Sequence, residues 1–182
     1  MKKAAPAVLG VLLLVALTAC GGSKSDHADP AKLSKDEKAA VAGLEKAFTS
    51  SSSGALTAKE ARCVATDFVS GVGVKKLRAA GLITASGEVN TTSAPKFDAK
   101  TSGTFADALL GCVDYQKRLA DETAKSDTAV DAAKYETCLD KKLPNSFVKK
   151  LLVASQTQSK DATTLGQQAT KAMTDCKADA KK

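Results

Sequence analysis

The fold is decided by Cys63-Val-Ala-Thr-Asp-Phe68 and the Val74-Lys-Lys-Leu77 that follows it, because the chain repeats this pattern. The second copy is Cys138-Leu-Asp-Lys-Lys-Leu143, followed by Val148-Lys-Lys-Leu151. In both copies an apolar residue lies five positions after the cysteine, and a helix-breaking segment precedes Val-Lys-Lys-Leu. The repeat predicts two copies of one helical unit, unless Val-Lys-Lys-Leu recurs by chance in a chain rich in these residues.

Helical spacing of apolar residues continues on both sides of the repeat. Capping boxes at Ser34–Glu37 and Thr57–Glu60 predict two of the helix starts. The helix that begins near Thr104 is expected to continue past Leu119. The expected helices begin near these residues: Ser34, Thr57, Val74, Thr104, Ser126, Phe147 and Thr163.

Breaks and loops separate these helices. Pro144 is expected to end or kink the helix that carries Cys138, and residues 82–100 are expected to form a long surface loop. No segment alternates with a period of two, so almost no strand is expected. The predicted fold class is all-α, a disulfide-stapled bundle of about five or six helices, with duplicated units at 57–124 and 126–178 as one reading.

Residues 1–19 have the features of a secretory signal: Lys2 and Lys3 precede an uncharged stretch that is shorter than the roughly 20 residues of a membrane span. The stretch ends in Leu17-Thr18-Ala19-Cys20, which resembles the bacterial lipobox. The resemblance implies that diacylglycerol is attached to the thiol of Cys20 and that the chain is cut before it. An ordinary signal peptide with a chance cysteine is the alternative.

The lipobox interpretation divides the chain into a signal peptide at 1–19, a lipidated flexible tether at 20–33 and a helical domain at 34–182. It places the domain on the extracytoplasmic face of the bacterial cell membrane, held there through the lipid on Cys20.

Four cysteines remain after Cys20, and an even number in an exported domain indicates disulfides. They are Cys63, Cys112, Cys138 and Cys176. The repeat favours bridges within each unit, Cys63–Cys112 and Cys138–Cys176, although the sequence leaves the other two pairings open. No CxxC motif is present and no histidine lies near the cysteines in sequence, so no metal site is expected.

The cysteine segments are also similar to a group of small exported actinobacterial proteins. The similarity rests on Glu60-Ala-Arg-Cys63, the Gly-Val-x-x-Leu-x-x-x-Gly-Leu pattern that ends at Leu82, Gly111-Cys112-Val-Asp114 and Thr137-Cys138-Leu139. It covers roughly residues 57–176. The resemblance implies a helical disulfide fold and export, and because the group has no agreed activity it implies no catalytic or ligand residues.

The charge of the chain indicates which kinds of partner it is expected to bind. Removing residues 1–19 removes two lysines and no acids, so the formal charge falls from +7 to +5 over 163 residues, enough for one domain. Lysine pairs favour an anionic envelope component, such as phospholipid headgroups or phosphate-bearing wall polymers, or simply solubilise an alanine-rich domain. Nucleic acid is not expected as a partner of an exported chain with 4% aromatic residues. The pairs are Lys75-Lys76, Lys141-Lys142, Lys149-Lys150 and Lys181-Lys182.

Residues that could carry catalysis are few. The only histidine, His27, falls in the predicted tether, where a solvated side chain is expected. Scattered aspartates could supply the paired carboxylates of a glycosidase, but such residues on alanine-rich helices more often face solvent. No catalytic, cofactor or metal site is therefore predicted. The aspartates are Asp114, Asp121, Asp131 and Asp140.

The leading hypothesis is a lipid-anchored envelope lipoprotein whose helical domain binds a protein or an anionic envelope component, or acts as a structural module without catalysis. The alternative is a carrier of a lipid or small apolar ligand between the helices, and an enzyme ranks third. An apolar cavity of a few hundred Å³, which is about the size of a small-molecule site, would favour the carrier. A tightly packed bundle with a lysine-rich face would favour the binding module.

Overall fold

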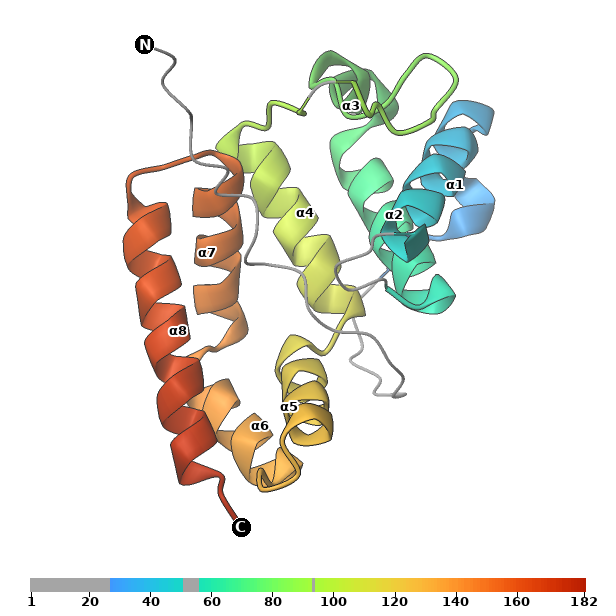
Figure 1. The fold of residues 1–182 in the computed structure, drawn as a ribbon. Helices are drawn as coiled ribbons and strands as arrows, with labels where there is room; N and C mark the ends of the chain where they lie inside the picture. Colours follow the sequence, from blue (N-terminus) through green and yellow to red (C-terminus); the bar gives the residue numbers. More distant parts are fainter. Residues whose placement is uncertain (1–26, 51–55, 93) are drawn as a thin grey trace.

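The computed structural model describes residues 27–50, 56–92 and 94–182. In these ranges the chain forms one short 3-10 helix and eight α-helices (Figure 1). The described residues form no strand, and their β-pairing is limited to two isolated bridges. The predicted all-α, disulfide-stapled fold is confirmed. The elements are η1 (Pro30–Lys32), α1 (Lys35–Ser50), α2 (Ala58–Val72), α3 (Val74–Ala79), α4 (Ala99–Cys112), α5 (Tyr115–Ser126), α6 (Ala132–Lys142), α7 (Asn145–Gln156) and α8 (Asp161–Asp179).

Two hydrophobic cores divide these helices into two groups of four. The first core joins α1 to α4 around Leu44 and Phe68, and the second joins α5 to α8 around Tyr135 and Leu139. Helix α4 lies in the middle of the molecule, where it packs against α2 on one side and α7 on the other (Figure 1). The two groups therefore meet along α4.

The repeated sequence pattern occupies equivalent places in the two groups. The apolar residue five positions after the cysteine is buried in both copies, Phe68 in the first and Leu143 in the second. The valine and leucine of Val-Lys-Lys-Leu are also buried in both, while the lysines between them lie at the surface or half-buried. Each copy thus forms one corner, in which a short break lets the next helix turn back onto the same core.

A disulfide joins the second and fourth helix of each group. Cys63 on α2 is bonded to Cys112 at the end of α4, with a Cα–Cα distance of 5.8 Å. Cys138 on α6 is bonded to Cys176 on α8, with a Cα–Cα distance of 5.5 Å. These are the two within-unit bridges that the repeat favours. Each disulfide therefore links the helix that carries the repeated cysteine to the last helix of its group.

The helix expected to run from Thr104 past Leu119 is two helices. Helix α4 begins earlier, at Ala99, because the side chain of Asp98 accepts the Thr101 N–H at 2.6 Å. The chain becomes extended at Val113, and Asp114 caps a new helix, α5. Since α5 packs on α6, the boundary between the groups lies at 113–114 and not at 125.

The loop after α3 is more closely packed than expected. Residues 82–100 were expected to form a surface loop, but Ile83 is buried in the first core. Gly87 is also buried, and its positive φ of 89° lets the loop turn against the backbone of Ala39 and Ala40 on α1. The loop therefore covers one end of the first core.

The start of α6 lies later than the expected Ser126. The side chain of Asp131 accepts the Lys134 N–H at 3.1 Å, so the helix begins at Ala132. Val130 precedes the helix, and it is still buried in the second core. The break at Pro144 follows the prediction, because α6 ends at Lys142.

Candidate functional site

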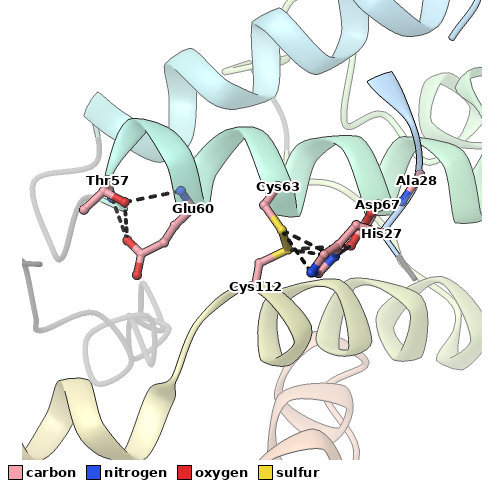
Figure 2. The surroundings of a disulfide bond; sticks show 7 residues. All are labelled: His27, Ala28, Thr57, Glu60, Cys63, Asp67 and Cys112. Atoms are coloured by element: carbon pink, nitrogen blue, oxygen red, sulfur yellow. Dashed lines mark hydrogen bonds and ion pairs between the residues drawn. A yellow bond between two sulfur atoms is a disulfide. The ribbon is translucent and has the colours of Figure 1, made fainter. Parts of the chain in front are cut away.

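The side chain of His27 lies against the Cys63–Cys112 disulfide, as Figure 2 shows. Its Nδ1 atom is 3.6 Å from the Sγ atom of Cys63 and 4.0 Å from the Sγ atom of Cys112. Its Nε2 atom is 4.0 Å from the Cys63 Sγ atom. The imidazole therefore contacts both sulfur atoms, with the closer contact to Cys63.

Asp67 holds His27 in this position. It lies four residues after Cys63 on α2, so the two side chains share one face of the helix. One carboxylate oxygen, Oδ2, is 2.6 Å from His27 Nδ1, and the other, Oδ1, accepts the backbone N–H of Ala28 at 2.8 Å. The Oδ2 atom also lies 3.6 Å from the Cys112 Sγ atom. One carboxylate thus links the N-terminal segment to the disulfide (Figure 2).

These contacts correct the prediction for the end of the tether. Residues 27–33 were expected to be flexible and His27 to be solvated. His27 is exposed, as expected, but His27 and Ala28 are hydrogen-bonded to Asp67, and Leu33 packs against the first core. The side chain of His27 stays 36% exposed and that of Asp67 19% exposed, so the pair lies at the surface of the domain.

The nitrogen, sulfur and oxygen atoms of this cluster all lie within 4.8 Å of one another. In the part of the chain that the structure describes, no other cluster brings cysteine, histidine and carboxylate together in this way. Because the two sulfur atoms are bonded to each other, they are not available as metal ligands. The chemistry open to the cluster is that of a disulfide beside an imidazole and a carboxylate.

The second disulfide has different surroundings. Cys176 is fully buried, and both Cys138 and Cys176 belong to the apolar second core. The structure thus contains two disulfides at equivalent places in the repeat, of which only the first has a histidine and an aspartate against its sulfur atoms among the described residues.

Three of the four aspartates considered for a glycosidase have structural partners. Asp114 and Asp131 cap helices, and Asp121 forms an ion pair with Lys117 at 3.0 Å. Asp114, Asp121 and Asp140 nevertheless lie near the side chain of Glu136. Burial raises the pKa of Glu136, the charge of Lys117 opposes this rise, and the charges of the three aspartates add to it. They form an acidic surface between α5 and α6.

A basic groove of about 630 Å³ lies between the start of α1 and the junction of α2 with α3. Its lining includes four basic and two acidic side chains. Asp36 is paired with Arg78 at 3.3 Å. The pKa of Glu37 is lowered by a hydrogen bond with the Ser34 side chain and by the Ser34 N–H, which its carboxylate accepts. The charged lining residues are Lys35, Asp36, Glu37, Lys75, Lys76 and Arg78.

The lysine pairs differ in whether they form salt bridges with acidic side chains. Lys149 is paired with Asp107 at 2.6 Å and Lys142 with Asp175 at 3.6 Å. Lys75 and Lys76 are exposed, and neither forms a salt bridge with any residue in the described ranges. Hydrogen bonds with Thr101 lower the pKa of Asp98, and the charge of Lys76 adds a smaller lowering. The groove therefore keeps an excess of positive charge.

The predicted lipidation site, Cys20, lies outside the described residues, as does the whole signal peptide. Among the described helices, none is long and apolar enough to cross a membrane. No protein-family model, no curated protein and no solved structure matches the chain.

Proposed function

We propose that this chain is a lipid-anchored lipoprotein of the bacterial envelope, and that its helical domain binds a phosphate-bearing envelope component in the basic groove at Lys75-Lys76. The lipobox pattern at Leu17–Cys20 supports the anchor. The groove supports the choice of an anionic ligand, because unpaired ammonium groups in a concave surface attract phosphate.

One observation carries the assignment of the groove. The two copies of Val-Lys-Lys-Leu place equivalent lysines at the surface, but only the first copy lines the groove. In the second copy, Lys149 is neutralised by Asp107. The same motif thus supplies a ligand-facing pair in one group and an ion pair to α4 in the other.

The carrier hypothesis receives less support. The groove is open, and although much of its lining surface is apolar, most of its lining residues are charged. A second pocket of about 340 Å³ is lined by Asp114, Gln116, Asp140 and Asn145 among others. Neither is the enclosed apolar cavity that a lipid chain would need. A binding module therefore agrees better with the described surface than a carrier does.

The test compares the two lysine pairs in the mature chain carrying Cys20→Ser, which removes the lipid as a source of membrane binding. The probes are vesicles of anionic phospholipid, vesicles of zwitterionic phospholipid, and a soluble polyol phosphate polymer. Near an anionic surface each lysine contributes about 1 kcal/mol. We expect Lys75→Gln with Lys76→Gln to weaken binding about tenfold or more, and Lys149→Gln with Lys150→Gln to change it little.

Vesicle binding alone would identify a headgroup as the ligand, and polymer binding alone would identify a wall polymer. The proposal is contradicted if no anionic probe binds, or if the two double variants weaken binding equally. Binding should also fall as salt rises, because exposed charges are screened.

A further inference from the structure

The two disulfides offer an internal comparison. The bonded residues are 49 positions apart in the first and 38 apart in the second, so the chain-entropy contributions of the two are nearly equal. Their surroundings are not equal. Cys63 and Cys112 are both partly exposed and contact a histidine, whereas Cys138, although also partly exposed, packs against the apolar second core and Cys176 is fully buried in it. Any difference in reactivity must arise from these surroundings.

An imidazole beside a disulfide favours its reduced form. When the bond opens, a protonated imidazole stabilises a thiolate at the nearer sulfur, as in other cysteines that are activated by histidine. His27 lies closest to Cys63, and Asp67 holds the ring through a 2.6 Å contact to Nδ1. Because Asp67 and the Cys63 sulfur both approach Nδ1, the imidazole acts on Cys63 by its positive charge and not as a base that removes a thiol proton through the other ring nitrogen.

The other sulfur has the opposite environment. Cys112 Sγ lies 3.6 Å from the carboxylate of Asp67, which disfavours a second negative charge and can accept a hydrogen bond from a neutral thiol. Cys112 also lines the open pocket of about 340 Å³, through which a small thiol can approach. The cluster thus distinguishes the two cysteines: one is suited to be a thiolate, the other to be attacked and to become a neutral thiol.

We propose that Cys63–Cys112 is a thiol–disulfide exchange site that accepts electrons from external thiols, with Cys63 as the sulfur stabilised by His27. The thiolate of one external thiol attacks Cys112 Sγ, the Cys63–Cys112 bond breaks, and Cys63 leaves as a thiolate beside His27. A second external thiolate then attacks the external sulfur of the mixed disulfide. Cys112 is released and protonated, and the two external thiols become one disulfide.

In balance, two external thiols are oxidised, one protein disulfide is reduced to two thiols, and two electrons pass to the protein. The reverse reaction begins with attack of the Cys112 thiolate on an external disulfide, and the Cys63 thiolate then attacks Cys112 Sγ and releases the external thiolate. Stabilising the reduced form makes a disulfide a stronger oxidant, so the site is suited to oxidise thiols. The Cys138–Cys176 bridge has no such neighbour in the described structure and remains a structural bond.

The first test treats the native protein with limiting dithiothreitol, quenches by alkylation and maps the labelled cysteines by mass spectrometry. We expect Cys63 and Cys112 to be labelled at least about tenfold faster than Cys138 and Cys176. Equal rates, or earlier opening of Cys138–Cys176, would overturn the proposal.

The second test separates a chemical role of His27 from simple covering of the sulfur. In a Cys112→Ser variant, whose helix content is checked by circular dichroism, Cys63 is a free thiol and its rate of alkylation by iodoacetamide is measured at neutral pH. Adding His27→Gln should slow this reaction by about tenfold if the imidazole stabilises the thiolate. If His27 only covers the sulfur, its replacement speeds the reaction, and the proposal is wrong.

The repeat provides a matched control. In a Cys176→Ser variant, Cys138 is the free thiol, and His27→Gln should leave its rate of alkylation unchanged. If the single-cysteine variants do not fold, the rate at which dithiothreitol opens Cys63–Cys112 in the otherwise native chain decides: His27→Gln should slow it, and a faster rate refutes the role of the imidazole.

Discussion

Thr57 and Glu60 form the capping box that begins α2. The Thr57 hydroxyl accepts the Glu60 N–H at 3.3 Å, and the Glu60 carboxylate accepts the Thr57 N–H at 2.8 Å. The same carboxylate is 3.4 Å from a guanidinium nitrogen of Arg118 on α5, whose side chain is 10% exposed. A single residue pair at a helix start thus also links the first group of helices to the second.

Replacing Thr57 by alanine removes the side-chain acceptor of this cap. Loss of such a cap costs about 1 kcal/mol of stability, so we expect a decrease of that size in the free energy of unfolding, measured by urea denaturation. Thr57→Ser keeps the hydroxyl and should retain most of the stability. If the two variants are equally stable, the hydroxyl does not cap α2.

The contact between His27 and the disulfide could not be predicted from the sequence. His27 is 36 residues from Cys63 and 40 from Asp67, so only the fold brings them together. A local signal did exist, because Asp67 lies one helical turn after Cys63 and faces the same side. That spacing indicates a carboxylate beside the sulfur, but not what binds it.

Among the helices, the starts marked by reciprocal capping were predicted correctly. Ser34 and Thr57 each have a glutamate three residues later, and both boxes form. The starts of α4, α5 and α6 were missed because each is capped by a lone aspartate, with no glutamate to complete the pattern. The capping aspartates are Asp98, Asp114 and Asp131.

The close approach of α1 to the loop after α3 depends on a glycine. A Cβ atom at Gly43 would collide with the backbone carbonyl of Gly87, which cannot move away as a flexible side chain could. We expect Gly43→Ala to lower the free energy of unfolding by about 1–3 kcal/mol, as overpacking does, when measured by thermal or urea denaturation.

Two other helical glycines serve as controls for this substitution. A Cβ atom at Gly103 on α4 or at Gly166 on α8 would meet nothing within 4 Å. Gly103→Ala and Gly166→Ala should raise stability by about 0.5–1 kcal/mol through higher helix propensity. A stabilising Gly43→Ala would show that the loop does not dock on α1 as described.

At the scale of the whole molecule, two similar four-helix groups meet along α4, which belongs to the first group and packs against α7 of the second. Gln116 on α5 is buried and donates a hydrogen bond to the Leu143 carbonyl at 2.7 Å, which fixes the corner of the second repeat copy. The Lys149–Asp107 ion pair joins α7 to α4. The repeat predicted the two corners and bridges, but not α5, because that helix lies outside the repeated pattern.

Ion pairs around α8 make stability depend on pH. Lys177 lowers the pKa of Asp127 through a side-chain hydrogen bond, and Lys171 does the same for Asp175. A lowered pKa in the folded state means that the stabilisation is present above the unfolded value of about 3.9 and is lost as pH falls through the folded value. Glu136 acts in the opposite direction, because burial raises its pKa.

We therefore expect Asp127→Asn to reduce the loss of stability below about pH 4 relative to the native chain. The measurement is the urea midpoint as a function of pH between neutral and strongly acidic conditions. Parallel pH profiles for the two chains would contradict a stabilising role of the Lys177–Asp127 pair. Asp179→Asn, near the same end of α8, serves as the control.

The central claim is a lipid-anchored domain whose four remaining cysteines are all paired. The most direct test is the intact mass of the protein extracted from membranes, measured after alkylation with and without prior reduction. We predict a chain that begins at Cys20 and carries diacylglycerol, with no cysteine labelled before reduction and four labelled after it. A mature mass without diacylglycerol, or cysteines that react before reduction, would contradict the account.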